Sequence, residues 1–358
     1  MRELSRRQLT VATAHRQLLI ERVKLTPAQA IKRLTPLQGQ HPPSPHIALA
    51  ARLEGFERAR LEAALRARSV VKTTIMRVTL HLAAGADYPA YAQLMRQSRL
   101  RWLRARDPGL DVERVARELE PWLREPRRNT EIRERVRGYD GVPDEEWGPI
   151  LLVRALFPLV QVPPGGHWSD TGRAPWVLDP RPLPDPDDAA ELVVRRYLAA
   201  FGPASRRDLA AWAGVAQRDL GTVWERVKTV SYCDERGTEL LDLPRRRLPP
   251  ESTRLPVRFL SSWEQPLLAY ADRERVMAPE VQALKLTLSG DPTVTVDGRV
   301  AASWRIERDG GAARLTVTPH VDLSRAAVAE IRAEGERTAR FCEPDATSVA
   351  IAILEGRR

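Results

Sequence analysis

The clearest fold signal in the chain is the stretch Gly202-Pro203-Ala204-Ser205-Arg206-Arg207-Asp208-Leu209-Ala210-Ala211-Trp212-Ala213-Gly214. Ser205 is a favourable N-cap residue, and Asp208, three positions later, completes the capping-box pattern. Gly214 readily adopts the left-handed backbone that ends many helices. The stretch therefore predicts a short helix that begins after Ser205 and ends at Gly214.

Neighbouring segments extend this helix into a larger unit. One helix is expected before it, over residues 187–200, and another after it, over residues 217–228. Strands over residues 230–234 and 239–243 then flank the turn Glu235-Arg236-Gly237. Three helices followed by a β-hairpin are typical of the winged-helix variant of the helix-turn-helix unit.

The same order of elements occurs twice nearer the N-terminus. In the first unit, Ser5 and Thr26-Pro27 begin two expected helices, and the spacing of apolar residues predicts a third, long helix. These helices cover residues 6–19, 27–34 and 47–68, and the strands that follow cover residues 70–76 and 78–82, joined near Arg77. The second unit has expected helices over residues 111–123, 129–136 and 144–156 and strands over residues 159–162 and 175–178. The Pro-rich segment 179–186 is typical of a linker.

Residues after about position 251 predict a small β-rich domain. Asp297-Gly298 is a strong signal for a tight hairpin between two strands. Strands are expected over residues 285–289, 293–296, 300–307 and 313–319, followed by an amphipathic helix over residues 324–342. The expected fold class is mainly α with β-hairpin wings (α+β). Its expected domains are three winged-helix units, residues 1–110, 111–180 and 187–250, and a C-terminal domain, residues 251–358.

The charge balance favours a nucleic-acid partner. The 358 residues carry 57 Lys and Arg against 47 Asp and Glu, a formal net charge of +10. Arg supplies most of this excess, and its planar guanidinium suits phosphates and guanine edges. No apolar run reaches the roughly 20 residues that a membrane helix needs, so no membrane partner is expected. The segment after Ser5-Arg6-Arg7 lacks the apolar core of an export signal, which predicts a cytoplasmic, nucleoid-associated protein.

No metal or other cofactor is expected. Cys233 and Cys342 lie far apart and lack the paired spacing of a zinc site. His41 and His46 flank a proline-rich segment, but no third ligand stands near them in the sequence. The sequence also lacks a glycine-rich motif that could cradle a phosphate.

A pair of glutamines stands out in Leu37-Gln38-Gly39-Gln40, which runs into the expected rigid loop His41-Pro42-Pro43-Ser44-Pro45-His46. The prolines disfavour helix there, and in an extended segment residues two apart point to the same side. Gln38 and Gln40 could thus present both amides to one small volume and hold a water molecule or read a base edge. From the spacing alone, a polar loop whose amides bond its own backbone is the more common arrangement.

Several basic and polar residues are candidate DNA contacts. Arg77, Thr79 and His81 lie at the expected hairpin of the first unit, where His81 could instead bond within its own hairpin. Arg206 and Arg207 begin a helix whose dipole opposes their charge, so a phosphate would explain them, as would simple solvation. Arg299, in the expected tight hairpin turn, could probe a groove or be merely exposed.

These stretches together resemble the AlkZ-like winged-helix DNA glycosylases, a bacterial family that excises alkylated bases. The matching residues are Leu37–Gln38-Gly39-Gln40, Ile75-Met76-Arg77-Val78-Thr79-Leu80-His81-Leu82, residues 202–212, and Asp297-Gly298-Arg299-Val300 with Trp304. The resemblance covers most of the chain and implies a tandem winged-helix array bent around duplex DNA. It places Gln38 and Gln40 on the two catalytic positions of a Gln–apolar–Gln motif. Gly39 departs from the motif, in which the middle residue is usually aliphatic, and this could weaken the alignment of the two amides or make room for a bulky adduct.

The resemblance implies a monofunctional DNA glycosylase that acts, as a monomer, on double-stranded DNA carrying alkylated purines. Two amides could suffice because a purine alkylated at N7 is cationic and leaves the sugar as a neutral base. Such enzymes serve general alkylation repair or self-resistance to a DNA-alkylating natural product. The alternatives are a non-catalytic winged-helix regulator or lesion sensor and, from net charge alone, a structural chromatin-type binder. A regulator would be expected to dimerise on symmetric half-sites, whereas three units in one chain favour enclosure of a single site.

Overall fold

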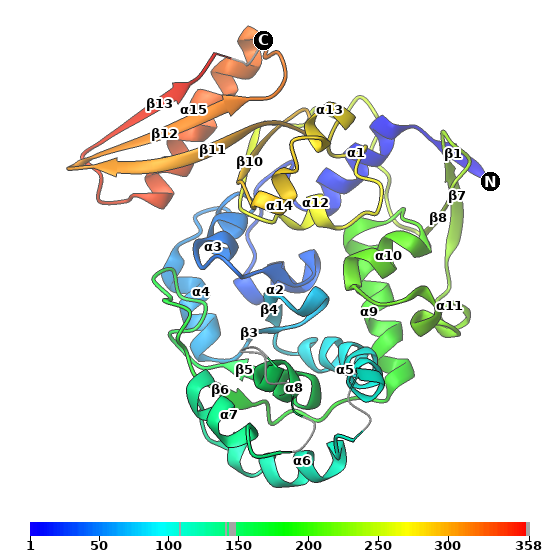
Figure 1. Ribbon diagram of the computed structural model, residues 1–358. Coiled ribbons are helices and arrows are strands. Elements are labelled where there is room, and N and C mark those ends of the chain that lie inside the picture. Colours follow the sequence, from blue (N-terminus) through cyan, green and yellow to red (C-terminus); the bar gives the residue numbers. More distant parts are fainter. Residues whose placement is uncertain (107–108, 140–141, 143–147, 356–358) are drawn as a thin grey trace.

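A computed structural model describes residues 1–106, 109–139, 142 and 148–355 and shows a mixture of helices and short sheets. In Figure 1 these elements run around a central region that contains β3 (Val70–Thr74) and β4 (Leu80–Ala84), while α15 (Arg325–Cys342) and the last three strands project at the upper left. The α+β class expected from the sequence is confirmed.

The first helices are α1 (Arg6–Arg16), α2 (Pro27–Leu34), α3 (Pro43–Ala50) and α4 (Arg58–Arg66). The side chains of Ser5 and Thr26 cap α1 and α2, as expected. The long helix expected over residues 47–68 is wrong, because the chain leaves helical geometry between α3 and α4, where Gly55 has a φ of 58°.

The expected proline loop is also wrong, because α3 begins within it at Pro43. Pro42 already has helical dihedral angles, with φ −55° and ψ −42°. The backbone N–H groups of a first helical turn have no partner within the helix, so prolines lacking that group fit there without loss. His46 is consequently a buried helical residue and not part of a loop.

A five-stranded sheet forms the centre of the molecule, in the order β2-β4-β3-β5-β6. The strands are β2 (Leu37–Gln38), β3 (Val70–Thr74), β4 (Leu80–Ala84), β5 (Leu159–Gln161) and β6 (Trp176–Leu178), and neighbouring strands are antiparallel. The first and second expected units therefore contribute strands to one sheet. Their boundaries remain predictions.

Between these strands lie α5 (Tyr88–Arg106), α6 (Val112–Leu119), the 3-10 turn η2 (Trp122–Arg124), α7 (Asn129–Val136) and α8 (Gly148–Leu156). The helix α5 was not expected from the sequence. The helix expected over residues 111–123 ends at Leu119, and the chain then reaches Pro121, which cannot continue the hydrogen-bond pattern of a helix. Residues 144–147 of the next expected helix lie outside the described residues.

The third unit contains α9 (Pro186–Phe201), α10 (Arg206–Ala213), the 3-10 turn η3 (Gln217–Leu220), α11 (Val223–Arg226), β7 (Val230–Asp234) and β8 (Glu239–Asp242). Ser205 and Asp208 form the expected capping box, and Gly214 ends α10 in left-handed geometry. The helix expected over residues 217–228 is wrong, because it breaks at Gly221, whose dihedral angles are φ 3° and ψ −111°. The hairpin carries a third strand, since β1 (Arg2–Leu4) pairs in parallel with β7.

The C-terminal part has a sheet in the order β13-β12-β11-β10-β9. Asp297 and Gly298 both have positive φ, which confirms the tight turn between β10 and β11. The strand expected over residues 285–289 is wrong, because Lys285 and Gly290 bound a helical turn there. The elements are β9 (Arg258–Leu260), α12 (Gln265–Leu268), α13 (Pro279–Gln282), α14 (Leu286–Ser289), β10 (Thr293–Val296), β11 (Arg299–Asp309), β12 (Ala312–Pro319), α15 (Arg325–Cys342) and β13 (Ser348–Ile353).

Trp212 of α10 lies at the centre of the largest core. It is fully buried, and its ring centroid lies 5.1 Å from that of Tyr197 and 6.0 Å from that of Phe201, both on α9. Its indole N–H donates to Gln265 Oε1 at 3.1 Å.

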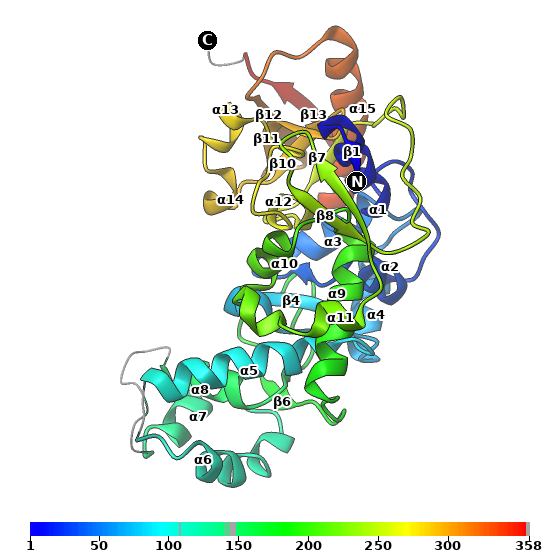
Figure 2. The same cartoon turned by 90° about the vertical axis from the view of Figure 1, so that its right-hand side faces the viewer.

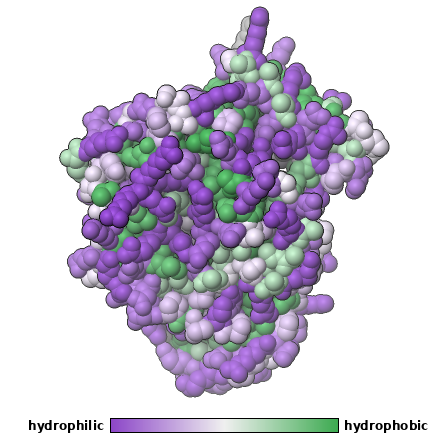
Figure 3. Space-filling view, turned by 180° about the vertical axis from the view of Figure 1, so that it is seen from behind, coloured by the Kyte–Doolittle hydropathy of each residue, from purple (hydrophilic) through white to green (hydrophobic). Residues whose placement is uncertain are grey.

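The surface seen from behind is largely hydrophilic, with apolar patches between the polar side chains (Figure 3). Among the described helices, none has the length and apolar character to cross a membrane.

Candidate active site

The two glutamines lie at the edge of the central sheet. Gln38 is the last residue of β2 and stands opposite His81 of β4. The backbone N–H of Gly39 donates to the Leu80 carbonyl at 2.8 Å, which continues the pairing past β2. The extended geometry expected for Gln38 is therefore confirmed.

Both amide oxygens accept hydrogen bonds from the backbone. Gln38 Oε1 accepts from the Gln40 N–H at 2.6 Å, and Gln40 Oε1 accepts from the Leu80 N–H at 3.3 Å. Gln38 is 7% exposed, whereas Gln40 is exposed to solvent. An amide oxygen has two lone pairs, so each can accept one further hydrogen bond. These contacts hold one amide firmly and leave the other accessible.

Gly39 is closely packed against β4. A Cβ atom placed on Gly39 would lie 2.8 Å from Leu82 Cδ1 and 3.7 Å from the His81 Cα. Leu82 is fully buried and already fills the space that a middle aliphatic residue would occupy. A side chain at position 39 would press on Leu82, so close packing against β4 explains the glycine.

Substitution of Gly39 by valine is expected to lower the free energy of unfolding by about 1–3 kcal/mol, because it overpacks the contact with Leu82. A Leu82→Val substitution should relieve part of this cost, so the two changes should be less damaging together than their sum. Urea unfolding of both single variants and the double variant measures this coupling. Simple additivity of the two losses would contradict the packing explanation.

Arg77 lies at the tip of the β3–β4 hairpin but is not exposed there. It occupies a 3-10 turn, Met76–Val78, and its Nη1 donates to the carbonyl oxygen of Trp212 in α10. Burial lowers the pKa of the guanidinium, and the nearby Arg273 cation lowers it further. Its Nη2 is buried and has no hydrogen-bond partner among the described residues. The side chain thus anchors the hairpin and retains one unused donor.

His81 is a neutral, buried histidine. Its Nδ1–H donates to the Thr79 carbonyl at 2.9 Å, which leaves Nε2 as an acceptor with no partner in the described part of the chain. Burial, and then the charge of Arg77, lower its pKa to about 3. The hydroxyl of Thr79 donates to the Met76 carbonyl at 3.1 Å. Both side chains therefore bond within their own hairpin, and a DNA contact for them stays a prediction.

Acidification is expected to destabilise the fold between about pH 6.5 and pH 4. Burial lowers the pKa of His46 to about 4, although its Nε2 bonds the Gly166 carbonyl at 3.0 Å, and the pKa of His81 is about 3. Unfolding restores both to about 6.5, so the unfolded chain binds more protons in this range. The contribution of the two neutral histidines to the free energy of unfolding is fully present above pH 6.5. Near pH 5 it falls by about 1.4 kcal/mol per pH unit for each histidine.

Urea unfolding at pH 7.5, 6 and 5 tests this dependence. A His46→Gln variant should show a shallower slope, whatever its stability at pH 7.5, since one titrating group is gone. Equal free energies of unfolding at pH 7.5 and 5 would show that these histidines are not buried in neutral form.

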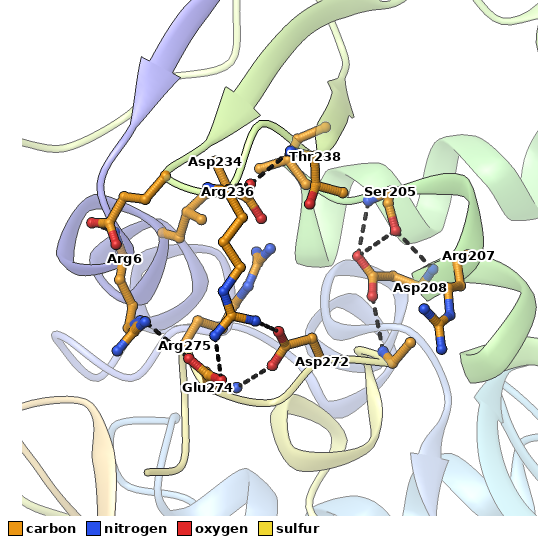
Figure 4. A pocket seen from close by; sticks show the side chains of 14 residues that line it. Arg6, Ser205, Arg207, Asp208, Asp234, Arg236, Thr238, Asp272, Glu274 and Arg275 are labelled. Atoms are coloured by element: carbon orange, nitrogen blue, oxygen red, sulfur yellow. Dashed lines mark hydrogen bonds and ion pairs between the residues drawn. The ribbon is translucent and has the colours of Figure 1, made fainter. Parts of the chain in front are cut away.

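The remaining predicted contact residues lie on other elements. Arg206 stacks on Trp224, with its guanidinium 5.3 Å from the ring centroid. Arg207 lines a cavity of about 290 Å³ between α1, the start of α10 and the β7–β8 turn (Figure 4). Arg299 begins β11 just after the tight turn, is half-buried and donates to the Glu274 carbonyl at 3.3 Å.

The cavity in Figure 4 is separate from the glutamine pair, since no residue of the 37–40 or 75–80 segments lines it. Its charges pair with one another: Arg6 lies 2.9 Å from Glu274, and Arg236 lies 2.9 Å from Asp272. Neither Arg206 nor Arg207 forms an ion pair with a described carboxylate. Contacts of these two arginines with phosphate stay predictions.

Two cationic neighbours of the hairpin were not expected from the sequence. Arg99 of α5 is half-buried and donates to the carbonyls of Ile75 and Arg154, and desolvation of its guanidinium lowers its pKa to about 10. Arg273 Nη1 donates to the Thr287 hydroxyl at 3.1 Å, and its Nε lacks a partner among the described residues. A prediction of α5 as a helix packed on the hairpin would have pointed to Arg99.

Within the described ranges, no cluster of metal-binding side chains occurs.

Comparisons with known proteins identify the family and the fold. A family described as DNA glycosylase AlkZ-like matches residues 31–341. An interstrand DNA cross-link repair glycosylase of Streptomyces sahachiroi is 26% identical over 366 residues, covering 93% of this chain and 95% of that protein. The solved structure of Streptomyces sahachiroi DNA glycosylase AlkZ has the same fold, with a TM-score of 0.82 at 24% identity, and the match covers 98% of this chain and all of that one. Because the family match spans most of its length, the chain belongs to the AlkZ-like DNA glycosylases.

Proposed function

We propose that this protein is a monofunctional DNA glycosylase that releases cationic alkylated purines, such as N7-alkylguanine, from double-stranded DNA. The observation that carries the proposal is the pair of amides at the sheet edge, one held at 2.6 Å by the neighbouring backbone and the other exposed beside it. The match to a cross-link repair glycosylase supports a related substrate, including cross-linked or bulky adducts.

In the proposed reaction, Gln38 and Gln40 position the attacking water. Each amide oxygen accepts a hydrogen bond from that water through its remaining lone pair, and the amide dipoles favour positive charge at the anomeric carbon. The water oxygen bonds to that carbon as the glycosidic electron pair moves to the base, which leaves neutral. The proton of the water passes to solvent. No general acid is required, because alkylation already makes the base a good leaving group.

Basic side chains near the hairpin would hold the DNA backbone. Arg77 and Arg273 each retain a buried N–H donor without a partner among the described residues. The Arg273 cation lies close enough to Arg77 to lower its pKa. Because these donors are buried, the two guanidinium groups would attract the DNA backbone through their charge. Arg206, Arg207 and Arg299 are further proposed contacts, on the third unit and the C-terminal sheet.

The direct test incubates the protein with duplex DNA that contains one N7-methylguanine and scores abasic sites by alkaline cleavage. Release of the alkylated base, with no release of uracil from a matched duplex, is the expected result, because uracil would leave as an anion. A second duplex with an N7-linked interstrand cross-link tests whether cross-links are also opened. Tight binding with no release from either cationic substrate would overturn the catalytic proposal.

One observation favours the non-catalytic alternative, a DNA lesion sensor. Both amide oxygens already bond backbone N–H groups, as they would in a purely structural role. The sensor predicts selective binding to alkylated duplex without base release. The abasic-site assay therefore separates the two functions.

A further inference from the structure

Val78 adopts a backbone conformation that is unfavourable for its side chain. Its φ is 58°, in the left-handed region that β-branched residues rarely occupy. The side chain is also 47% exposed, so burial of its methyl groups in the protein does not compensate for the conformation. A strained, exposed valine at a hairpin tip calls for an explanation outside the folded chain.

The tip that carries Val78 is held rigidly from several directions. Arg77 bonds the Trp212 carbonyl of α10, and a Cβ on Gly214 would lie only 2.8 Å from Arg77 Cγ. Within the turn, the Thr79 N–H donates to the Met76 carbonyl at 3.1 Å. Arg99 fixes the base of the turn by donating to the Ile75 carbonyl. The exposed methyl groups are therefore presented from a fixed support.

Val78 also lies close to the glutamine pair and to unused cationic donors. Leu80, whose N–H donates to Gln40 Oε1, follows Val78 by two residues. The Cα atoms of Val78 and Leu80 are therefore at most about 7 Å apart. Arg77, adjacent in sequence, has a buried Nη2 with no hydrogen-bond partner among the described residues, and the Arg273 cation lies near it. Arg273 in turn bonds Thr287 of α14, and Figure 2 shows α14, α10 and β4 in succession down the molecule.

We infer that Val78 is a wedge that enters the base stack of duplex DNA beside the modified nucleotide. An apolar side chain between two bases unstacks them, and the nearby cations of Arg77 and Arg273 would attract the displaced backbone. Unstacking would bring the anomeric carbon to the water held by Gln38 and Gln40. This inference rests on the proposed glycosylase function, and it assigns Val78 a positioning role.

The main test compares wild type with Val78→Gly and Val78→Leu. Glycine adopts positive φ without strain, so Val78→Gly should fold with unchanged or higher stability in urea. It should nevertheless release N7-methylguanine from duplex about tenfold more slowly, with little change on single-stranded DNA, where no stack needs opening. Val78→Leu keeps an apolar side chain and should retain most of the duplex rate. Leu354→Asn, at an exposed apolar residue after β13, is the matched control.

A second measurement does not depend on catalysis. In a Gln38→Ala/Gln40→Ala background, 2-aminopurine placed next to the modified base should brighten on binding, because its fluorescence rises when it unstacks. Val78→Gly in the same background should remove this increase. Equal fluorescence with valine and glycine, or equal loss of rate on duplex and single strand, would overturn the wedge. Absence of base release by wild type would instead refute the glycosylase function and leave the fluorescence result to decide the wedge.

Discussion

Replacement of Gln38 or Gln40 by alanine is expected to slow release of N7-methylguanine from duplex DNA by about a hundredfold or more. Each substitution removes one of the two oxygens that would aim water at the anomeric carbon. The double variant should be little slower than the slower single variant, because residues that act on one water molecule act as a unit. Single-turnover rates from abasic-site cleavage measure the effect.

Three controls separate catalysis from folding and binding. Gln38→Glu and Gln40→Glu keep an oxygen acceptor, so they should retain more activity than the alanine variants. Gln282→Ala, in α13, removes another amide that bonds a backbone carbonyl and should not change the rate. Each variant should bind the alkylated duplex as wild type does. Alanine variants that release the base at wild-type rates would assign both glutamines a structural role.

Glu264→Ala is expected to reduce the free energy of unfolding by about 3–5 kcal/mol, because it leaves a buried charge without its partner. Arg52 and Glu264 are 0% and 1% exposed, and Arg52 Nη1 lies 2.6 Å from Glu264 Oε1. The guanidinium also donates to the carbonyls of Gln17 and Ala48, both at 2.8 Å, so it cannot move out to solvent without further losses. This cluster joins segments that lie 212 positions apart in the sequence.

The control for this effect is Glu54→Ala. Its pair with Lys24 is 3.9 Å long, and both side chains are largely exposed, so its loss should cost less than about 1 kcal/mol. Urea unfolding of both variants, at pH 7.5 and with linear extrapolation, gives the comparison. Losses of similar size would show that the Arg52–Glu264 pair contributes no more than a surface contact.

Local signals predicted the elements whose ends are capped. The capping box at Ser205 and Asp208, the capped start of α2 and the Asp297-Gly298 turn all occur where expected. Such signals depend on neighbouring residues only, and these can be read directly from the sequence. The helices expected over residues 47–68 and 217–228 were wrong because they rested on the spacing of apolar residues alone. This spacing does not show where a helix ends.

The glutamine pair shows the same division. The extended geometry of Gln38 was expected from the local sequence, and the family resemblance singled out Gln38 and Gln40. The bond from the Leu80 N–H to Gln40 and the packing of Leu82 against Gly39 could not be predicted, because they depend on the register of β2 against β4. That register joins residues about forty positions apart.

By itself, the sequence determined the α+β class, the basic charge, the helix caps and the identity of the two amides. These are properties of single residues or of near neighbours. The tertiary structure alone decided that Arg77 anchors its hairpin on α10, that His81 is buried and neutral, and that Val78 is the exposed tip. Each of these depends on which distant segments pack together, and packing is set by the burial of side chains from the whole chain.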